Sequence, residues 1–216
     1  MRQFVHFLAF LGGVALIFWG AVLWGYDPLW PLWVVAGLAV IAAVIVSVRR
    51  KGRELREALL AGEDVLGRWQ LSQADLTAFR AVDRDRKAIG KAYHNFLSFP
   101  RTAPPEGVPI IVGKRDWLIG TRLYRGNPPV GTLFCSVVLF DGDPGYIEVA
   151  MVERSSGAGH FLLLLRLPVP IAARAAAQAV TAALAARVPR PNFERLQRSF
   201  PDYLLSLPSR SPAVTG

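Results

Sequence analysis

Two neighbouring apolar stretches at the start of the chain constrain its fold more than any other feature. They cover residues 4–26 and 29–48, and two residues separate them. Each is about 20 residues long, the length at which a helix crosses ~30 Å of hydrocarbon. No charged side chain lies between His6 and Asp27, and none lies in the second stretch. The pattern predicts a transmembrane helical hairpin over residues 1–48.

A cleaved signal peptide is the alternative interpretation of residues 1–25. Its apolar core would be longer than is usual for a signal peptide, and no small-x-small cleavage site precedes Asp27. We therefore expect the first stretch to remain as a helix.

Basic residues predict the orientation of the hairpin. Five of them follow the second stretch, Arg2 precedes the first, and residues 25–30 contain no Lys or Arg. The positive-inside rule then places both termini in the cytoplasm. Tryptophan and tyrosine cluster around the turn, where aromatic rings favour the headgroup level. We expect a multi-pass protein of the bacterial inner membrane.

Small residues predict how the two helices pack. Small side chains let helix backbones approach closely within a membrane. Two glycines share a face of the first helix, and three alanines give the second a small-residue side. The expected packing residues are Gly13, Gly20, Ala36, Ala39 and Ala43.

The positive charge of the chain gathers in two places. The formal net charge is +9. One basic group lies in a predicted juxtamembrane helix over residues 49–62, and the other lies on one face of a predicted helix within residues 73–97. Cations near a bilayer attract anionic lipid with about 1 kcal/mol each, although a charged helix face is more often simply solvated. The candidate lipid contacts are Arg49, Arg50, Lys51, Arg53, Arg80, Arg84, Lys87 and Lys91.

Beyond the hairpin, the chain predicts one cytoplasmic α+β domain over residues 63–188, followed by a tail over residues 189–216. A first strand at 65–71 precedes the helical segment, and short strands separated by Gly/Pro turns follow it. An alanine-rich helix closes the domain. We expect a bent antiparallel sheet of about six strands, with a helical insert after the first strand and a C-terminal helix.

This layout resembles the membrane-anchored bacterial PH-like proteins, in which paired transmembrane helices precede a small β domain that a helix caps. The resemblance covers residues 1–188 and rests on layout, not on a motif. The helical insert departs from a plain PH order and is similar to the helix-grip (START-like) order, in which a long helix closes a ligand cavity. No lipid-binding residue is carried over from either family.

The chain contains few groups that could perform chemistry. Cys135 is the only cysteine and lies in an apolar run, which is typical of a buried thiol. The three histidines share no metal-ligand spacing. Asp141 and Asp143 lie in a Gly/Pro turn, and Glu148 and Glu153 lie on opposite faces of a predicted strand. We expect no catalytic site, metal or cofactor.

These patterns favour a non-enzymatic membrane protein whose cytoplasmic domain contacts a partner protein or an anionic lipid surface. A homo-oligomer is also compatible with them, whereas no nucleic-acid motif accompanies the positive charge. One alternative is a carrier or sensor of a lipid-like ligand, because the apolar strand at residues 161–165 needs cover on both faces. A membrane-linked enzyme without a recognisable motif is the other alternative.

Overall fold

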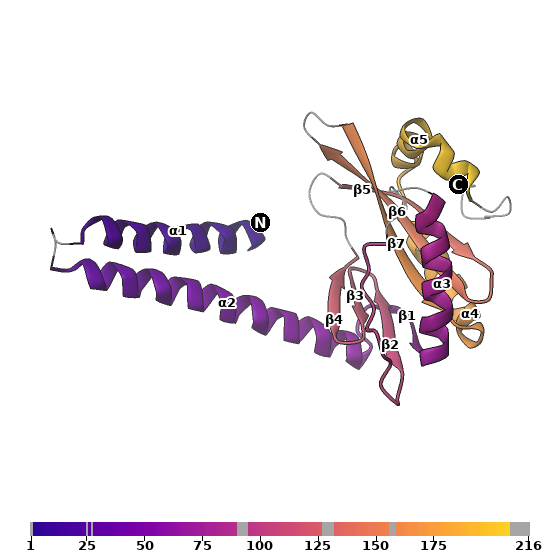
Figure 1. The fold of residues 1–216 in the computed structure, drawn as a ribbon, viewed down its shortest axis with the longest axis horizontal. Coiled ribbons are helices and arrows are strands. Elements are labelled where there is room, and N and C mark those ends of the chain that lie inside the picture. The colour runs from indigo at the N-terminus through magenta and orange to yellow at the C-terminus, as the bar shows by residue number, and fades with distance from the viewer. Residues whose placement is uncertain are drawn as a thin grey trace. The chain divides into compact units, whose positions relative to one another are not determined.

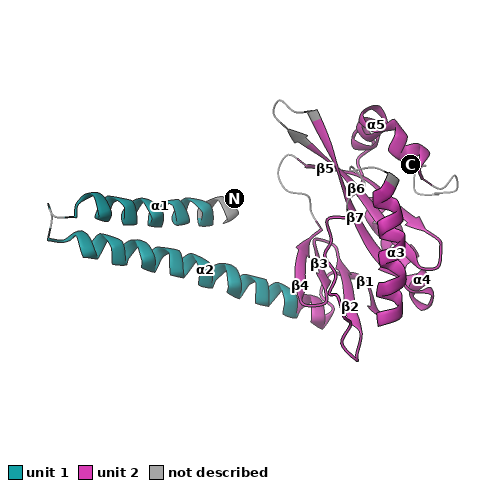
Figure 2. Cartoon of the chain, viewed as in Figure 1, with its two compact units in different colours: residues 1–57 teal, residues 58–216 magenta. Residues whose placement is uncertain are grey.

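The computed structural model describes residues 2–24, 26, 28–89, 95–126, 132–155 and 159–207. The chain divides into two compact units, residues 1–57 and residues 58–216 (Figure 2).

Two helices form unit 1. Helix α1 covers Arg2–Val22, and helix α2 covers Trp30–Ala61 and continues into unit 2 (Figure 1). Among the described residues, α2 is the one helix that is long and apolar enough to cross a membrane; the apolar part of α1, His6–Val22, is shorter. Only 6% of the most apolar window of α2 is buried inside the protein. The length and apolar composition of α2 are compatible with a membrane span.

Glycines bring α1 and α2 together. A Cβ atom added at Gly37 would lie 2.5 Å from the carbonyl oxygen of Gly13, and one added at Gly20 would lie 2.8 Å from Cγ2 of Val34. All three glycines are buried. The packing side of α2 therefore runs through Gly37 and not through the alanines expected from the sequence. Ala36, Ala39 and Ala43 are exposed.

Unit 2 contains two antiparallel sheets in place of the single bent sheet expected from the sequence. The four-stranded sheet A has the order β1 to β4, and the three-stranded sheet B has the order β5 to β7. The chain from β4 to β5 contains Pro128 and Pro129, which have no N–H groups with which to continue a ladder. The strands of sheet A are β1 (Val65–Leu71), β2 (Val108–Gly113), β3 (Asp116–Ile119) and β4 (Arg122–Arg125). The strands of sheet B are β5 (Thr132–Phe140), β6 (Gly145–Ser155) and β7 (Gly159–Val169).

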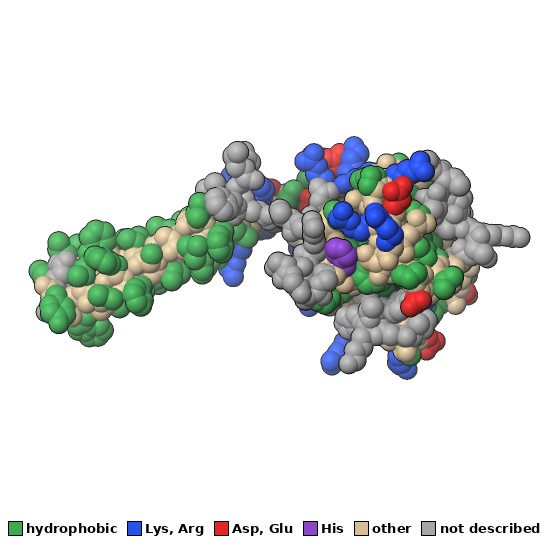
Figure 3. Space-filling model, turned by 90° about the horizontal axis from the view of Figure 1, so that it is seen from above, with side chains coloured by type: hydrophobic (Ala, Val, Ile, Leu, Met, Phe, Trp, Pro, Cys, Tyr) green, Lys and Arg blue, Asp and Glu red, His purple; other side chains and the backbone are tan. Residues whose placement is uncertain are grey.

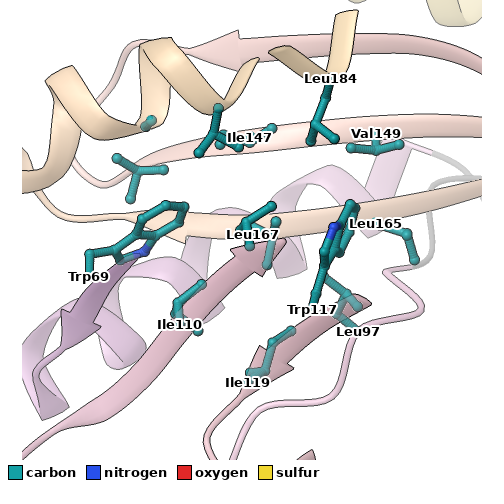
Figure 4. Close-up of a cluster of buried hydrophobic side chains, with 14 of the residues drawn as sticks. Trp69, Leu97, Ile110, Trp117, Ile119, Ile147, Val149, Leu165, Leu167 and Leu184 are labelled. Atoms are coloured by element: carbon teal, nitrogen blue, oxygen red, sulfur yellow. The ribbon is translucent and has the colours of Figure 1, made fainter. Parts of the chain in front are cut away.

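The main core forms where apolar side chains of both sheets meet helix α4, which covers Arg174–Ala185 (Figure 4). Trp69 of β1, Trp117 of β3 and Leu184 of α4 contribute large side chains to it. Helix α4 lies so close to β1 that a Cβ atom added at Gly67 would lie 2.5 Å from Cγ2 of Val180. The C-terminal closing helix is thus present, as the alanine-rich sequence predicts.

Helix α3 is the expected insert after β1 and covers Gln73–Ile89. Ser72 begins it with a reciprocal cap: the amide of Asp75 donates to Ser72 Oγ at 3.1 Å, and the amide of Ser72 donates to Asp75 Oδ2 at 2.8 Å. The helix does not reach residue 97, because Asn95 already forms a parallel bridge with Leu164 of β7. Phe96, the next residue, is exposed.

Two short helices cover the outer face of sheet B. Helices α5 (Arg190–Ser199) and α6 (Pro201–Leu205) belong to the same compact unit as the sheets. Their inward side chains are spaced by three, four and three residues and pack around Cys135, Ala150, Val152, Leu162 and Leu164. Residues 162–165 are therefore covered on both faces by protein, whereas Phe161 is 49% exposed. The packing side chains are Phe193, Leu196, Phe200 and Tyr203.

Candidate functional site

A fully buried ion pair lies on the outer face of sheet B, beside the apolar surface that α5 and α6 cover. Glu148 of β6 and Arg166 of β7 are directly opposite in the strand register, and both side chains are 0% exposed. Arg166 Nε lies 2.9 Å from Glu148 Oε2. The N–H is not aligned as a hydrogen bond, so the contact is best described as an ion pair.

Helix α3 adds further charges to this ion pair. Asp83 accepts a hydrogen bond from Arg166 Nη1, and Lys87 Nζ lies 2.7 Å from the other oxygen of Asp83. Arg86 Nη2 lies 3.4 Å from Glu148 Oε1, and its guanidinium group lies over the ring of Phe140. The side chain of Arg86 is only 12% exposed. The last turns of α3 are therefore held to sheet B by charged contacts, whereas Phe79 packs edge-on against Tyr146 of β6.

Helix α6 reaches the same carboxylate from the C-terminal end of the chain. The hydroxyl of Tyr203 donates to Glu148 Oε1 at 3.1 Å. Arg86 Nη2 donates to Ser206 Oγ at 3.4 Å, and that hydroxyl donates to the carbonyl oxygen of Tyr203 at 2.6 Å. Glu148 thus receives groups from β7, α3 and α6. We call Asp83, Arg86, Lys87, Glu148, Arg166, Tyr203 and Ser206 the charge network.

Burial dominates the electrostatics of the charge network. It raises the pKa of Glu148, while the guanidinium groups of Arg86 and Arg166 act in the opposite direction. Burial also raises the pKa of Tyr203 well above its ordinary value, so the phenol remains a protonated donor at neutral pH. The network sets guanidinium and ammonium groups against carboxylates, and Tyr203 adds one hydroxyl donor. Its chemistry is that of an internal clamp joining three elements.

Asn95 fastens the chain after α3 to the edge of sheet B. Its Nδ2 donates to the carbonyl oxygen of Arg166 at 3.1 Å, and its Oδ1 accepts from the amide of Arg166 at 2.9 Å. The same oxygen accepts from the amide of Leu97 at 3.0 Å. Farther along, the hydroxyl of Tyr124 in β4 pairs with the backbone of Ser98. The segment at residues 95–98 therefore connects the β7 edge to the β4 edge.

The juxtamembrane cations are available for external contacts. Arg49, Arg50, Lys51 and Arg53 are exposed on α2. Arg50 makes an exposed ion pair with Glu54 at 3.0 Å, one turn farther along the helix. Such pairs contribute little energy in water, so an anionic headgroup can replace the carboxylate.

The candidate lipid contacts on α3 do not form one free stripe. Arg80 donates through Nη2 to the carbonyl oxygens of Pro100 and Arg101, the latter at 2.8 Å. Lys87 pairs with Asp83, whereas Arg84 is exposed. Lys91 lies outside the described residues. Internal partners therefore occupy two of the three described candidates.

The remaining groups considered in the sequence occupy structural positions. Burial raises the pKa of the Cys135 thiol to about 11, which keeps it protonated and unreactive. Asp141 pairs with Arg174 at 3.1 Å. Glu153 is exposed, whereas Glu148 is buried. Among the described residues, no group of three or more His, Cys, Asp or Glu side chains could hold a metal ion.

Sequence reasoning missed the charge network, although the chain carried a signal for it. Arg166 interrupts an apolar run in β7, Glu148 lies between apolar residues of β6, and the two carry opposite charges. A charge in such a strand is costly to bury unless a partner neutralises it. The partners from α3 and α6 carried no comparable signal, because they lie more than 30 residues away along the chain.

Comparisons with protein-family models, curated proteins and solved structures give no match for this chain.

Proposed function

We propose that this protein is a non-enzymatic, membrane-anchored interaction module whose cytoplasmic domain contacts an anionic lipid surface. The observation that carries the proposal is the nearly bare apolar surface of α2, of which 6% of the most apolar window is buried. Hydrophobic side chains cover the visible face of unit 1 (Figure 3). Because water disfavours such a surface, a bilayer is its natural environment.

We propose that α1 joins α2 as a second spanning helix. The glycine contacts between the two helices support this assignment, since close backbone approach is typical of helix pairs in lipid. The rings of Trp24 and Trp30 stack 4.8 Å apart at the turn, where an aromatic belt is expected. With cations after α2 and none in the turn, both termini are assigned to the cytoplasm of a bacterial inner membrane.

We assign the main lipid contact to the exposed cations that directly follow the apolar part of α2. The hairpin holds them at the headgroup level, so their binding costs no additional association entropy. Arg84 and Lys87 of α3 form a weaker second contact, because Lys87 must leave Asp83 to join it. The main contact residues are Arg49, Arg50, Lys51 and Arg53.

The architecture of unit 2 supports a PH-like interaction domain over a ligand carrier. Two antiparallel sheets and a closing C-terminal helix agree with the PH-like layout, although α3 is an insertion relative to it. A helix-grip carrier requires an apolar cavity beneath the closing helix. Here the core beneath α4 contains large side chains, including those of Trp69, Trp117 and Leu184 (Figure 4).

Native mass spectrometry of the detergent-extracted full chain tests the lipid contact. We expect the protein to retain phosphatidylglycerol in preference to phosphatidylcholine. Replacing the four main contact residues with Gln should remove that preference. A matched control replaces four exposed cations of unit 2 with Gln, and it should behave like the native protein. Equal retention of both lipids by the native chain would contradict the proposal. The control residues are Arg115, Arg125, Arg190 and Arg198.

A further inference from the structure

The C-terminal helices and α3 are attached to sheet B through one shared carboxylate. Oε1 of Glu148 receives Tyr203 from α6 at 3.1 Å and Arg86 from α3 at 3.4 Å. These two donors are separated by 117 positions along the chain (203 − 86). The two donors therefore meet at the same acceptor because of the tertiary fold, and not because they are close in the sequence.

A shared buried carboxylate makes the two attachments depend on each other. Glu148 is 0% exposed, so each donor that leaves makes the burial of the remaining charge less favourable. Water that enters to solvate the carboxylate also reaches Arg86, because both Arg86 and Tyr203 contact Ser206. The low dielectric that strengthens a paired buried group also makes an unpaired one costly. The release of α6 should therefore loosen the last turns of α3.

The attached state keeps the cations of α3 occupied by internal partners. Arg86 is paired with Glu148, and Lys87 is paired with Asp83. Asp83 in turn belongs to the same cluster through Arg166. Opening the charge network would release Arg86 beside Arg84 and Lys87, which are already exposed or partly exposed, and so increase the number of cations that can reach a phosphate.

We propose that α5 and α6 form an autoinhibitory cover, which, through Tyr203 and Glu148, holds the cations of α3 away from anionic lipid. This proposal rests on the proposed function, because it concerns regulation of the second lipid contact. Linkage requires reciprocity: release of the cover strengthens lipid binding by α3, and anionic lipid favours release of the cover. The contact of Arg49 to Arg53 is independent of the cover.

Hydrogen exchange of the full chain in nanodiscs tests the coupling. Tyr203→Phe removes one hydroxyl and keeps the ring packing. We expect exchange to rise about tenfold both in α6 and at residues 83–89, since the loss of one buried hydrogen bond costs about 1.4 kcal/mol. The control Thr181→Val removes a buried hydroxyl that donates to the carbonyl oxygen of Ala177 within α4. It should leave exchange in α3 and α6 unchanged.

Hydrogen exchange measured in two different bilayers tests the effect of lipid on the cover. In nanodiscs that contain phosphatidylglycerol, α6 of the native protein should exchange faster than in nanodiscs of phosphatidylcholine alone. Replacing Arg84, Arg86 and Lys87 together with Gln should abolish the difference. If Tyr203→Phe accelerates exchange in α6 but not at residues 83–89, or if both bilayers give equal exchange in α6, the cover is not autoinhibitory. Lipid retention through Arg49 to Arg53 is measured separately and would persist in either case.

Discussion

Arg166 is the single charged residue of β7 that directly faces a charged residue of opposite sign on β6. An isolated charge of either sign would not be tolerated at this depth, so the pair is energetically a unit. The cost of changing one partner should therefore differ from the cost of changing both. Burial also determines the reactivity of the Cys135 thiol on β5.

We expect Glu148→Leu to lower the free energy of unfolding by about 3–5 kcal/mol, because it removes one of the two carboxylates paired with the buried Arg166 and leaves Asp83 as its counter-charge. The double variant Glu148→Leu with Arg166→Met should recover part of this loss, since an apolar pair fits the strand. Urea titration with hydrogen exchange as the probe measures both values. A double variant less stable than the single one would mean that the pair is not a unit.

Cys135 should resist alkylation in the folded protein. Its pKa of about 11, raised by burial from 9.0, leaves very little thiolate at pH 8. Iodoacetamide should label it only after unfolding in urea. Rapid labelling of the native protein at pH 8 would show that β5 is accessible. An unlabelled native thiol also permits single-cysteine experiments elsewhere in the chain.

The elements are placed by close backbone approach at a few glycines. Gly67 lets α4 lie against β1, and Gly37 lets α2 lie against α1. In both cases the Cβ atom of an added methyl group would lie 2.5 Å from an atom of the facing helix. Each contact therefore predicts a cost for a larger side chain.

Gly67→Ala should destabilise unit 2 by about 1–3 kcal/mol, because the added Cβ would lie 2.5 Å from Val180 and α4 must shift away from β1. Thermal unfolding followed by circular dichroism measures the change. Gly142→Ala is the matched control, since its Cβ would have no neighbour closer than 3.5 Å. If the two variants unfold at the same temperature, the helix is not closely packed.

Gly37→Leu should separate α1 from α2 and lower the thermal stability of the detergent-solubilised chain. Gly13→Leu and Gly20→Leu should act in the same direction, since both glycines meet α2 within 3 Å of an added Cβ. Ala39→Leu is the control, because Ala39 is exposed. Size-exclusion chromatography after heating reports the effect. An unchanged profile for the three glycine variants would argue against a closely packed hairpin.

In the whole molecule, the two units differ in how far they bury their apolar side chains. Unit 1 exposes apolar side chains, whereas unit 2 buries them between two sheets and their covering helices. We therefore expect the apolar turn of the hairpin and the sheets to lie on opposite sides of a membrane.

Cysteine labelling in intact cells tests this arrangement. A membrane-impermeant maleimide should label Tyr26→Cys from outside, because Tyr26 is exposed at the turn between the helices. It should not label Thr121→Cys, an exposed position in the turn between β3 and β4, until the cells are opened. Labelling of Thr121→Cys in intact cells would reverse the orientation.

Local sequence patterns were sufficient to predict the helices that have a repetitive apolar or alanine-rich pattern. The apolar length of α2, the cap at Ser72 and the alanine-rich α4 each follow from interactions between residues close along the chain. The helical insert after β1 was predictable for the same reason, although its end was not. Asn95, which lies beyond the described end of α3, bonds to β7, a partner about 70 residues away.

The pairing of charged side chains could be seen only in the tertiary structure. The sequence predicted one cationic stripe that consists of Arg80, Arg84, Lys87 and Lys91. In the structure, Arg80 donates to backbone carbonyl oxygens and Lys87 pairs with Asp83. It also placed Glu148 and Arg166 opposite each other and covered them with α3 and α6. A helical wheel reports the face of one element, and pairing depends on strand register and on the docking of distant segments. Those contacts are long-range, so they exist only once the chain has folded.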